Sequence, residues 1–177
     1  MENIIETLKQ TLPLLGTEWL GKKNGYEKEL CNLLGWTCVD ARHYDAITPD
    51  KVYVEIKKGQ GGAIFDLVRY SELYRKQGQP DTILVFLDWK RSKKGNYVKE
   101  IIVVHSDSLC KWLLTPERAD YYLQEKTRVQ GMLNAQDKVR TKKLREIAFA
   151  TIRVGKIEQL HFDIFSSIPD GSSSDDD

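Results

Sequence analysis

The sequence predicts an α/β fold in which a mixed β-sheet is flanked by helices. Two kinds of segment alternate along residues 25–105, namely stretches with apolar side chains at helical spacing and strands recognised by alternating or continuous apolar residues. A chain of 177 residues is long enough to bury one core. We therefore expect a single domain over residues 1–168 with its core at about 25–105.

Two helices are predicted in the first part of the chain. Residues 3–15 carry apolar side chains at helical spacing, and so does the segment from Tyr26, where three leucines complete an apolar stripe. We expect Asn24 to cap the second helix, because asparagine favours that position. Gly35 is expected to end it, because glycine adopts the left-handed conformation at helix ends.

Residues 45–57 predict a β-hairpin. From Val52 onward, apolar and polar residues alternate with the period of two that is typical of a strand with one buried face. The turn before this strand is Thr-Pro-Asp-Lys at residues 48–51, with Pro and Asp where turns favour them. Glu55 and Lys57 then project from one face of the strand, and Asp45 at the end of the preceding strand can lie beside them.

A third helix and two further strands are expected after the hairpin. The helix is predicted from about Ala63 to Gln77, and the glycine-rich run 57–62 before it either receives a phosphate or is a plain connecting loop. Residues 82–87 are continuously apolar, as in a buried central strand, and residues 97–105 indicate another strand.

The rest of the chain is predicted to be a helical C-terminal elaboration at residues 116–165, which supplies either sequence recognition or a dimer interface. Residues 116–133 and 137–150 are expected to form helices, and residues 151–154 and 160–165 strands or extended edges. Residues 169–177 are polar and acidic, which predicts a disordered tail.

Composition narrows the class of protein. No apolar run approaches the length that crosses a membrane, and the N-terminus lacks a basic signal-peptide start, so we expect a cytoplasmic protein without membrane contact. The three cysteines form no C-x-x-C pair, which favours reduced thiols over a zinc site. His43 lies near Asp45 in the sequence, and the simplest interpretation is a histidine that fills space.

Asp45, Glu55 and Lys57 form the candidate catalytic group. Two neighbouring carboxylates suit a hard divalent cation, and an adjacent lysine can hold or deprotonate a water molecule. Asp50 makes a literal Pro-Asp pair, but it lies only five positions before Glu55 and belongs to the turn. The alternative interpretation of the three residues is a set of paired charges on a solvated strand face.

These residues resemble the motif of the PD-(D/E)xK nuclease superfamily, and the chain is most similar to its type II restriction endonucleases. The matching residues are Asp45 and then Glu55-Ile56-Lys57, and the order helix, hairpin, helix, strand, strand also matches over about residues 25–105. The resemblance implies a restriction-endonuclease-like core. It implies Mg²⁺ held by Asp45, Glu55 and the main-chain carbonyl of Ile56, with Mn²⁺ substituting and Ca²⁺ binding without cleavage.

Glu27 is a fourth candidate catalytic residue. The superfamily often has a glutamate on the helix before the hairpin, where it binds a second metal or anchors the lysine, and Glu27 fits that pattern. It equally fits an ordinary glutamate in the first turn of a helix, which the helix dipole stabilises. Glu29 is predicted to face solvent.

The function implied by the resemblance is a metal-dependent endonuclease that hydrolyses DNA phosphodiester bonds. The closest type is a type II restriction enzyme, a homodimer that cuts a short duplex sequence and leaves 5′-phosphate and 3′-hydroxyl ends. The alternatives are a structure-selective nuclease of the same superfamily, such as a junction resolvase or repair nickase, and a non-catalytic DNA-binding module.

Basic residues provide the candidate contacts to double-stranded DNA. Between residues 126 and 156, nine Lys or Arg residues face two acidic residues, which indicates either a DNA-binding surface or a solvated helix face. The candidate DNA-binding residues are Lys58, Gln60, Arg69, Lys138, Arg140, Lys142 and Lys143.

Overall fold

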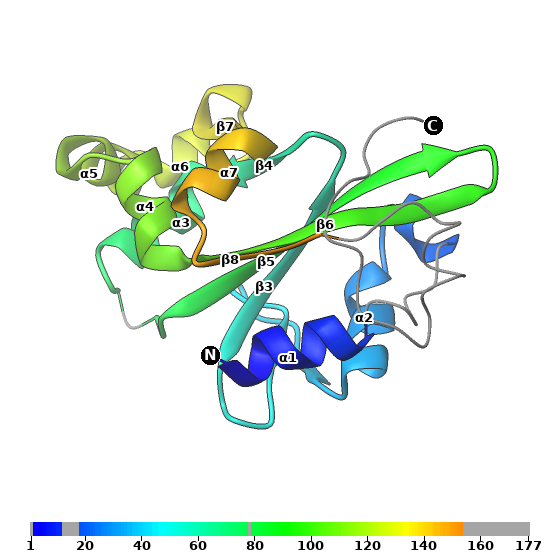
Figure 1. The fold of residues 1–177 in the computed structure, drawn as a ribbon. Helices are drawn as coiled ribbons and strands as arrows, with labels where there is room; N and C mark the ends of the chain where they lie inside the picture. Colours follow the sequence, from blue (N-terminus) through cyan, green and yellow to red (C-terminus); the bar gives the residue numbers. More distant parts are fainter. Residues whose placement is uncertain (1, 12–17, 78, 154–177) are drawn as a thin grey trace.

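A six-stranded mixed sheet with helices on both faces forms the centre of the protein, as the computed structural model shows (Figure 1). The model describes residues 2–11, 18–77 and 79–153. The strand expected at residues 160–165 and the acidic tail expected at 169–177 lie outside the described residues. Within the described part, the predicted α/β class with a mixed sheet between helices is confirmed.

The strands of the sheet follow one another in a simple order. Across the sheet they are β1 (Thr37–Cys38), β2 (Ala46–Ile47), β3 (Tyr53–Gly59), β5 (Thr82–Ser92), β6 (Gly95–His105) and β8 (Ala150–Arg153). Strands β3 and β5 run parallel, and the other neighbouring pairs are antiparallel. A separate two-stranded sheet joins β4 (Gly62–Asp66) to β7 (Gln136–Arg140). The parallel pair requires a crossover, which β4 and the following helix supply.

Helices cover the two faces of the sheet unequally. One face carries α1 (Glu2–Thr11), the short 3₁₀ helix η2 (Glu18–Gly21) and α2 (Tyr26–Leu34). The other carries α3 (Leu67–Tyr74), α4 (Ser106–Leu113), α5 (Pro116–Gln124), α6 (Lys126–Val129), the 3₁₀ helix η3 (Leu133–Ala135) and α7 (Thr141–Ile147). Along β5, Val85 packs into the first core and Phe86 into the second. Burial on both faces explains the continuous apolar run predicted for this strand.

The predicted hairpin is present as β2 and β3, with Ala46 opposite Val54 and Ile47 opposite Tyr53. Its turn closes where the Lys51 N–H donates to the Thr48 carbonyl at 2.9 Å. Strand β3 alternates as expected, with Val54 fully buried and its neighbours half-buried.

The helix predicted from Ala63 is wrong at its beginning. Residues 62–66 form strand β4, and the helix begins only at Leu67. Two features explain the difference. Gly62 packs against β7 so closely that a Cβ would meet the Val139 carbonyl oxygen at 2.6 Å. Asp66 caps the helix, because its carboxylate accepts from the main-chain N–H groups of Val68 and Arg69.

The C-terminal elaboration is also less helical than predicted. The helix expected at 116–133 ends at Gln124, and a separate short helix follows it. The helix expected at 137–150 is wrong in its first part, since residues 136–140 form strand β7 and only 141–147 are helical. Buried Val139 lies between exposed neighbours, and β7 gains its main-chain partners from β4. Residues 151–153 are a strand, as predicted.

Two details of α2 differ from expectation. The N-cap position is Gly25 in the left-handed conformation, and Asn24 does not cap the helix. Leu33, one of the three leucines of the predicted apolar stripe, is 41% exposed, and Cys31 is buried in its place. Gly35 ends the helix in the left-handed conformation, as predicted.

Candidate active site

Asp45 is the residue immediately before β2, at the edge where β2 pairs with β3. The paired residues end at Ala46 opposite Val54, and beyond that pair the Asp45 N–H donates to the Val54 carbonyl at 2.8 Å. The Asp45 side chain turns back onto β3, where its Oδ2 accepts from the Ile56 N–H at 2.7 Å. One carboxylate oxygen is thereby fixed against the strand that carries Glu55 and Lys57.

The two carboxylates repel each other in a half-buried environment. Burial raises the pKa of Glu55 to about 8, and the negative charge of Asp45 adds to the shift. Burial and the charge of Glu27 raise the pKa of Asp45, opposed by its hydrogen bond from Ile56 and by nearby cations. Sites with such shifts are enriched in catalytic and metal-binding residues. The three acidic residues therefore share one electrostatic environment.

Lys57 projects from the same face of β3 as Glu55, as the strand period requires. Its ammonium nitrogen lies 5.4 Å from the centre of the Phe65 ring. Lys57 and Glu55 line a small pocket together with Arg69 and Tyr70 of α3. Lys57 and Arg69 are the cations that partly offset the burial of Glu55.

Glu27, the second residue of α2, lies close enough to this site for its charge to act on both Asp45 and Glu55. It is half-buried, whereas Glu29 in the same turn is exposed, as predicted. Burial, together with the nearby Glu27 carboxylate, raises the pKa of Tyr26. Glu27 also acts electrostatically on Lys58.

Lys58 lies on the opposite face of β3 from the pocket. Its ammonium is 4.8 Å from the centre of the Tyr26 ring and 5.4 Å from that of Trp89. Burial lowers the pKa of Lys58, against the effect of Glu27. The structure therefore places Lys58 in an aromatic environment beside Glu27 and away from the face that carries Lys57.

The glycine-rich run forms a tight connection between β3 and β4. Gly61 has a φ of 82°, and its N–H donates to the buried carboxylate of Asp88 at 3.1 Å. Because Asp66 caps the helix that follows, the amides at its N-terminus already have an acceptor. The phosphate cradle considered for this run is therefore not formed by helix α3. Gln60 is exposed at the tip of the connection.

The basic residues of the elaboration are divided between two elements. Lys138 and Arg140 are exposed on β7, and Arg140 lies opposite Gly62, beside the connection that carries Gln60. Lys142 is exposed on α7. Lys143 pairs with Glu146 at 2.8 Å and lies 5.2 Å from the Trp112 ring centre. Only part of the predicted basic surface thus lies near the glycine connection.

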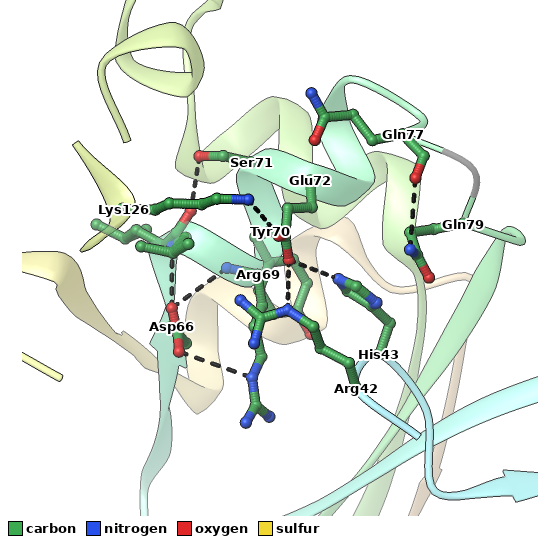
Figure 2. Close-up of polar contacts among 12 residues, drawn as sticks. Arg42, His43, Asp66, Arg69, Tyr70, Ser71, Glu72, Gln77, Gln79 and Lys126 are labelled. Carbon is green, nitrogen blue, oxygen red and sulfur yellow. Dashed lines mark hydrogen bonds and ion pairs between the residues drawn. The ribbon is translucent and has the colours of Figure 1, made fainter. Parts of the chain in front are cut away.

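A buried polar cluster beside the pocket was missed by sequence reasoning (Figure 2). The Glu72 Oε1 on α3 accepts from the Arg42 Nε at 2.7 Å and lies 2.9 Å from the His43 Nε2. His43 is 4% exposed, so it fills space as expected, but in a loop and against a carboxylate. The available signal was a glutamate at 72 between the packing positions of a predicted helix, since buried acidic residues require partners.

The donor set at the candidate site suits a hard cation. Asp45 and Glu55 offer carboxylate oxygens, and the Ile56 carbonyl points to the same edge as its N–H, as in any extended strand. Among the described residues, no three His, Cys, Asp or Glu side chains converge as a metal cluster. A cation at this edge would complete its shell with water and substrate oxygens, as Mg²⁺ commonly does.

Comparison with known proteins gives no assignment. No protein-family model matches the chain, and no curated protein matches it either. Within the described residues, no helix has both the length and the apolar character needed to cross a membrane.

Proposed function

We propose that the protein is a Mg²⁺-dependent DNA endonuclease with a restriction-endonuclease-like core. The observation that carries the proposal is the position of Asp45 beside Glu55, with its carboxylate bonded to the Ile56 N–H at 2.7 Å, on the strand from which Lys57 also projects. These are the residues that the PD-(D/E)xK resemblance assigned to catalysis. The order of strands around β3 and its parallel neighbour β5 is consistent with such a core.

Each residue has a distinct role in the proposed reaction. Asp45, Glu55 and the Ile56 carbonyl bind the cation, and the raised pKa of Glu55 means that a bound positive charge would favour its ionised form. The chemistry that a Mg²⁺ ion supplies when bound is stabilisation of negative charge on the phosphate and the leaving oxygen. Lys57 orients the attacking water and helps remove its proton.

The first experiment is digestion of a mixed-sequence plasmid with Mg²⁺, followed by sequencing of the ends. Discrete fragments with 5′-phosphate and 3′-hydroxyl ends support a type II restriction enzyme acting on double-stranded DNA. Cutting confined to branched DNA indicates a structure-selective nuclease. DNA binding without any cutting by the wild-type protein contradicts the catalytic proposal and leaves a DNA-binding module.

Glu27 can be tested with a control from its own helix. Glu27→Gln is expected to lower the cleavage rate at a fixed Mg²⁺ concentration, because its charge acts on Asp45 and Glu55. Glu29→Gln removes the same charge from an exposed position in the same turn and is expected to leave the rate unchanged. Equal rates for the two variants would exclude a role for Glu27.

We infer that the enzyme acts as a cytoplasmic homodimer, because a two-fold symmetric protein suits a palindromic duplex site. Sedimentation of the protein alone and with duplex DNA tests this inference. A monomer that cuts one strand at a time would contradict it.

A further inference from the structure

The pocket next to Glu55 and Lys57 contains two arginines from different parts of the chain. Arg42 comes from the loop between β1 and β2, and Arg69 from the first turn of α3. Both side chains remain partly open to solvent, with exposed fractions of 37% and 47%. Figure 2 shows the two guanidinium groups on the same side of the α3 helix.

A carboxylate holds each arginine from its Nε side. The Arg42 Nε donates to Glu72 at 2.7 Å, and the Arg69 Nε lies 3.7 Å from the Asp66 Oδ2. Contacts of this kind leave the terminal nitrogens of a guanidinium available for another acceptor. Arg42 and Arg69 therefore both offer terminal guanidinium N–H groups to the same pocket.

Glu72 is well placed to fix the position of Arg42. Its side chain is only 10% exposed, and its Oε1 contacts both Arg42 and His43. Its Oε2 lies 3.9 Å from the Lys126 Nζ, a further cation contributed by α6. Because His43 is itself buried, its contact fixes the position of the Glu72 carboxylate, which in turn holds Arg42.

We propose that Arg42 and Arg69 together bind a backbone phosphate of the substrate strand, with Glu72 as the positioning residue for Arg42. This inference rests on the proposed nuclease function, and it gives roles to two residues that the catalytic motif does not include, Arg42 in binding and Glu72 in positioning Arg42. A phosphate suits the pocket because its oxygens can accept from two planar forks at once. The phosphate also neutralises the repulsion between two neighbouring guanidinium groups.

The test measures binding of the full-length protein to a fluorescently labelled DNA duplex in EDTA, where cleavage does not interfere. Arg42→Ala and Arg69→Ala are each expected to weaken binding about tenfold. Each should also reduce the slope of log affinity against log salt concentration by about 0.9, the value for one lost phosphate contact. Arg91→Ala near the end of β5 is the matched control, because it removes an exposed arginine that lies outside the pocket and outside the basic segment 126–156.

Two further variants separate binding from folding. Arg42→Lys keeps the positive charge but lacks the planar guanidinium group. It should therefore have the wild-type dependence of affinity on salt concentration but only part of the wild-type affinity. Glu72→Gln removes a negative charge, which by charge alone would strengthen binding to DNA. The proposal predicts weaker binding instead, because Arg42 loses its orientation, and thermal melting of each variant confirms that it is folded.

The outcomes for the two proposals are distinct. If Arg42→Ala binds DNA as tightly as the control Arg91→Ala does, the phosphate pocket is overturned, even if the wild-type protein cuts DNA with Mg²⁺. A wild-type protein that shows the Arg42-dependent binding but never cuts DNA overturns the nuclease proposal and retains the pocket. Wild-type protein that does not bind the duplex in EDTA also overturns the pocket.

Discussion

Substitution of Glu55 by Gln should make the metal-free protein more stable, although it removes a candidate catalytic residue. The two side chains have nearly the same shape, but glutamine has no charge to bury beside Asp45. Burial and the Asp45 charge raise the pKa of Glu55 from 4.5 to about 8. A raised carboxyl pKa contributes stability that is fully present below pH 4.5 and is lost as the pH rises through about 8.

The size of the effect follows from the two pKa values. At pH 7 the unfolded chain releases a proton that the folded protein retains, which costs the folded state about 3 kcal/mol, and at pH 5 about 1 kcal/mol. Glu55→Gln removes this cost. We therefore expect the substitution to increase the free energy of unfolding by up to about 3 kcal/mol at pH 7 and by up to about 1 kcal/mol at pH 5.

Urea denaturation of both proteins in EDTA at the two pH values measures the difference. A millimolar concentration of Mg²⁺ or Ca²⁺ should then raise the melting temperature of the wild-type protein, because the cation binds only the folded state. The variant should show little of this shift. A Glu55→Gln protein that is less stable than the parent at pH 7, or whose gain does not depend on pH, would refute the reasoning.

Three other substitutions test the supports around the site. Arg145→Met should lower the free energy of unfolding by about 3–5 kcal/mol in urea denaturation, because it leaves the 2% exposed Glu100 carboxylate without its bidentate partner. If Arg145→Met destabilises the wild-type protein no more than it destabilises a Glu100→Gln protein, this reasoning is contradicted. Gly62→Ala should destabilise the protein by more than about 1 kcal/mol, since its Cβ would meet the Val139 carbonyl oxygen at 2.6 Å, and an unchanged melting temperature would argue against the close approach of β4 and β7. Contacts with Arg42 and His43 lower the pKa of Glu72, so the contribution of Glu72 to stability is present above pH 4.5 and is lost as the pH falls. The Glu72→Gln protein should therefore lose less stability than the wild type between pH 6 and pH 3. Equal losses in the two proteins would show that these contacts contribute little.

The hairpin could be predicted from sequence because its signals are local. Turn residues at 48–51 and strict alternation from Val52 fix both the turn and the face of each side chain. The hairpin also brings Asp45, the residue before β2, against the strand that carries Glu55. The apolar run at 82–87 was equally clear, since burial on both faces removes any need for polar residues.

Strands β4 and β7 could not be predicted because they stabilise each other over a long separation. Residues 62–66 pair with residues 136–140, and neither segment has strong strand character alone. Basic residues at 138–143 look like one face of a helix until the pairing with β4 is known. Tertiary pairing therefore overrode the local pattern on which the helix assignment depended.

The cluster around Glu72 was hidden for a similar reason. Arg42 and Glu72 are thirty positions apart and meet only because the loop before β2 packs against α3. The sequence showed a charged residue in an amphipathic helix, which is usually solvent-exposed. Only the packing of the helix against that loop reveals that Glu72 is buried and holds the Arg42 side chain toward the candidate site.

The most direct test of the central claim is the rate of Mg²⁺-dependent DNA cleavage by the wild-type protein and by Lys57→Ala, each saturated with the same substrate. Loss of a lysine that orients the attacking water should lower the rate by about 10²–10⁴-fold while DNA binding is retained. Cleavage by Lys57→Ala at the wild-type rate would contradict the assignment of Asp45, Glu55 and Lys57 as one active site.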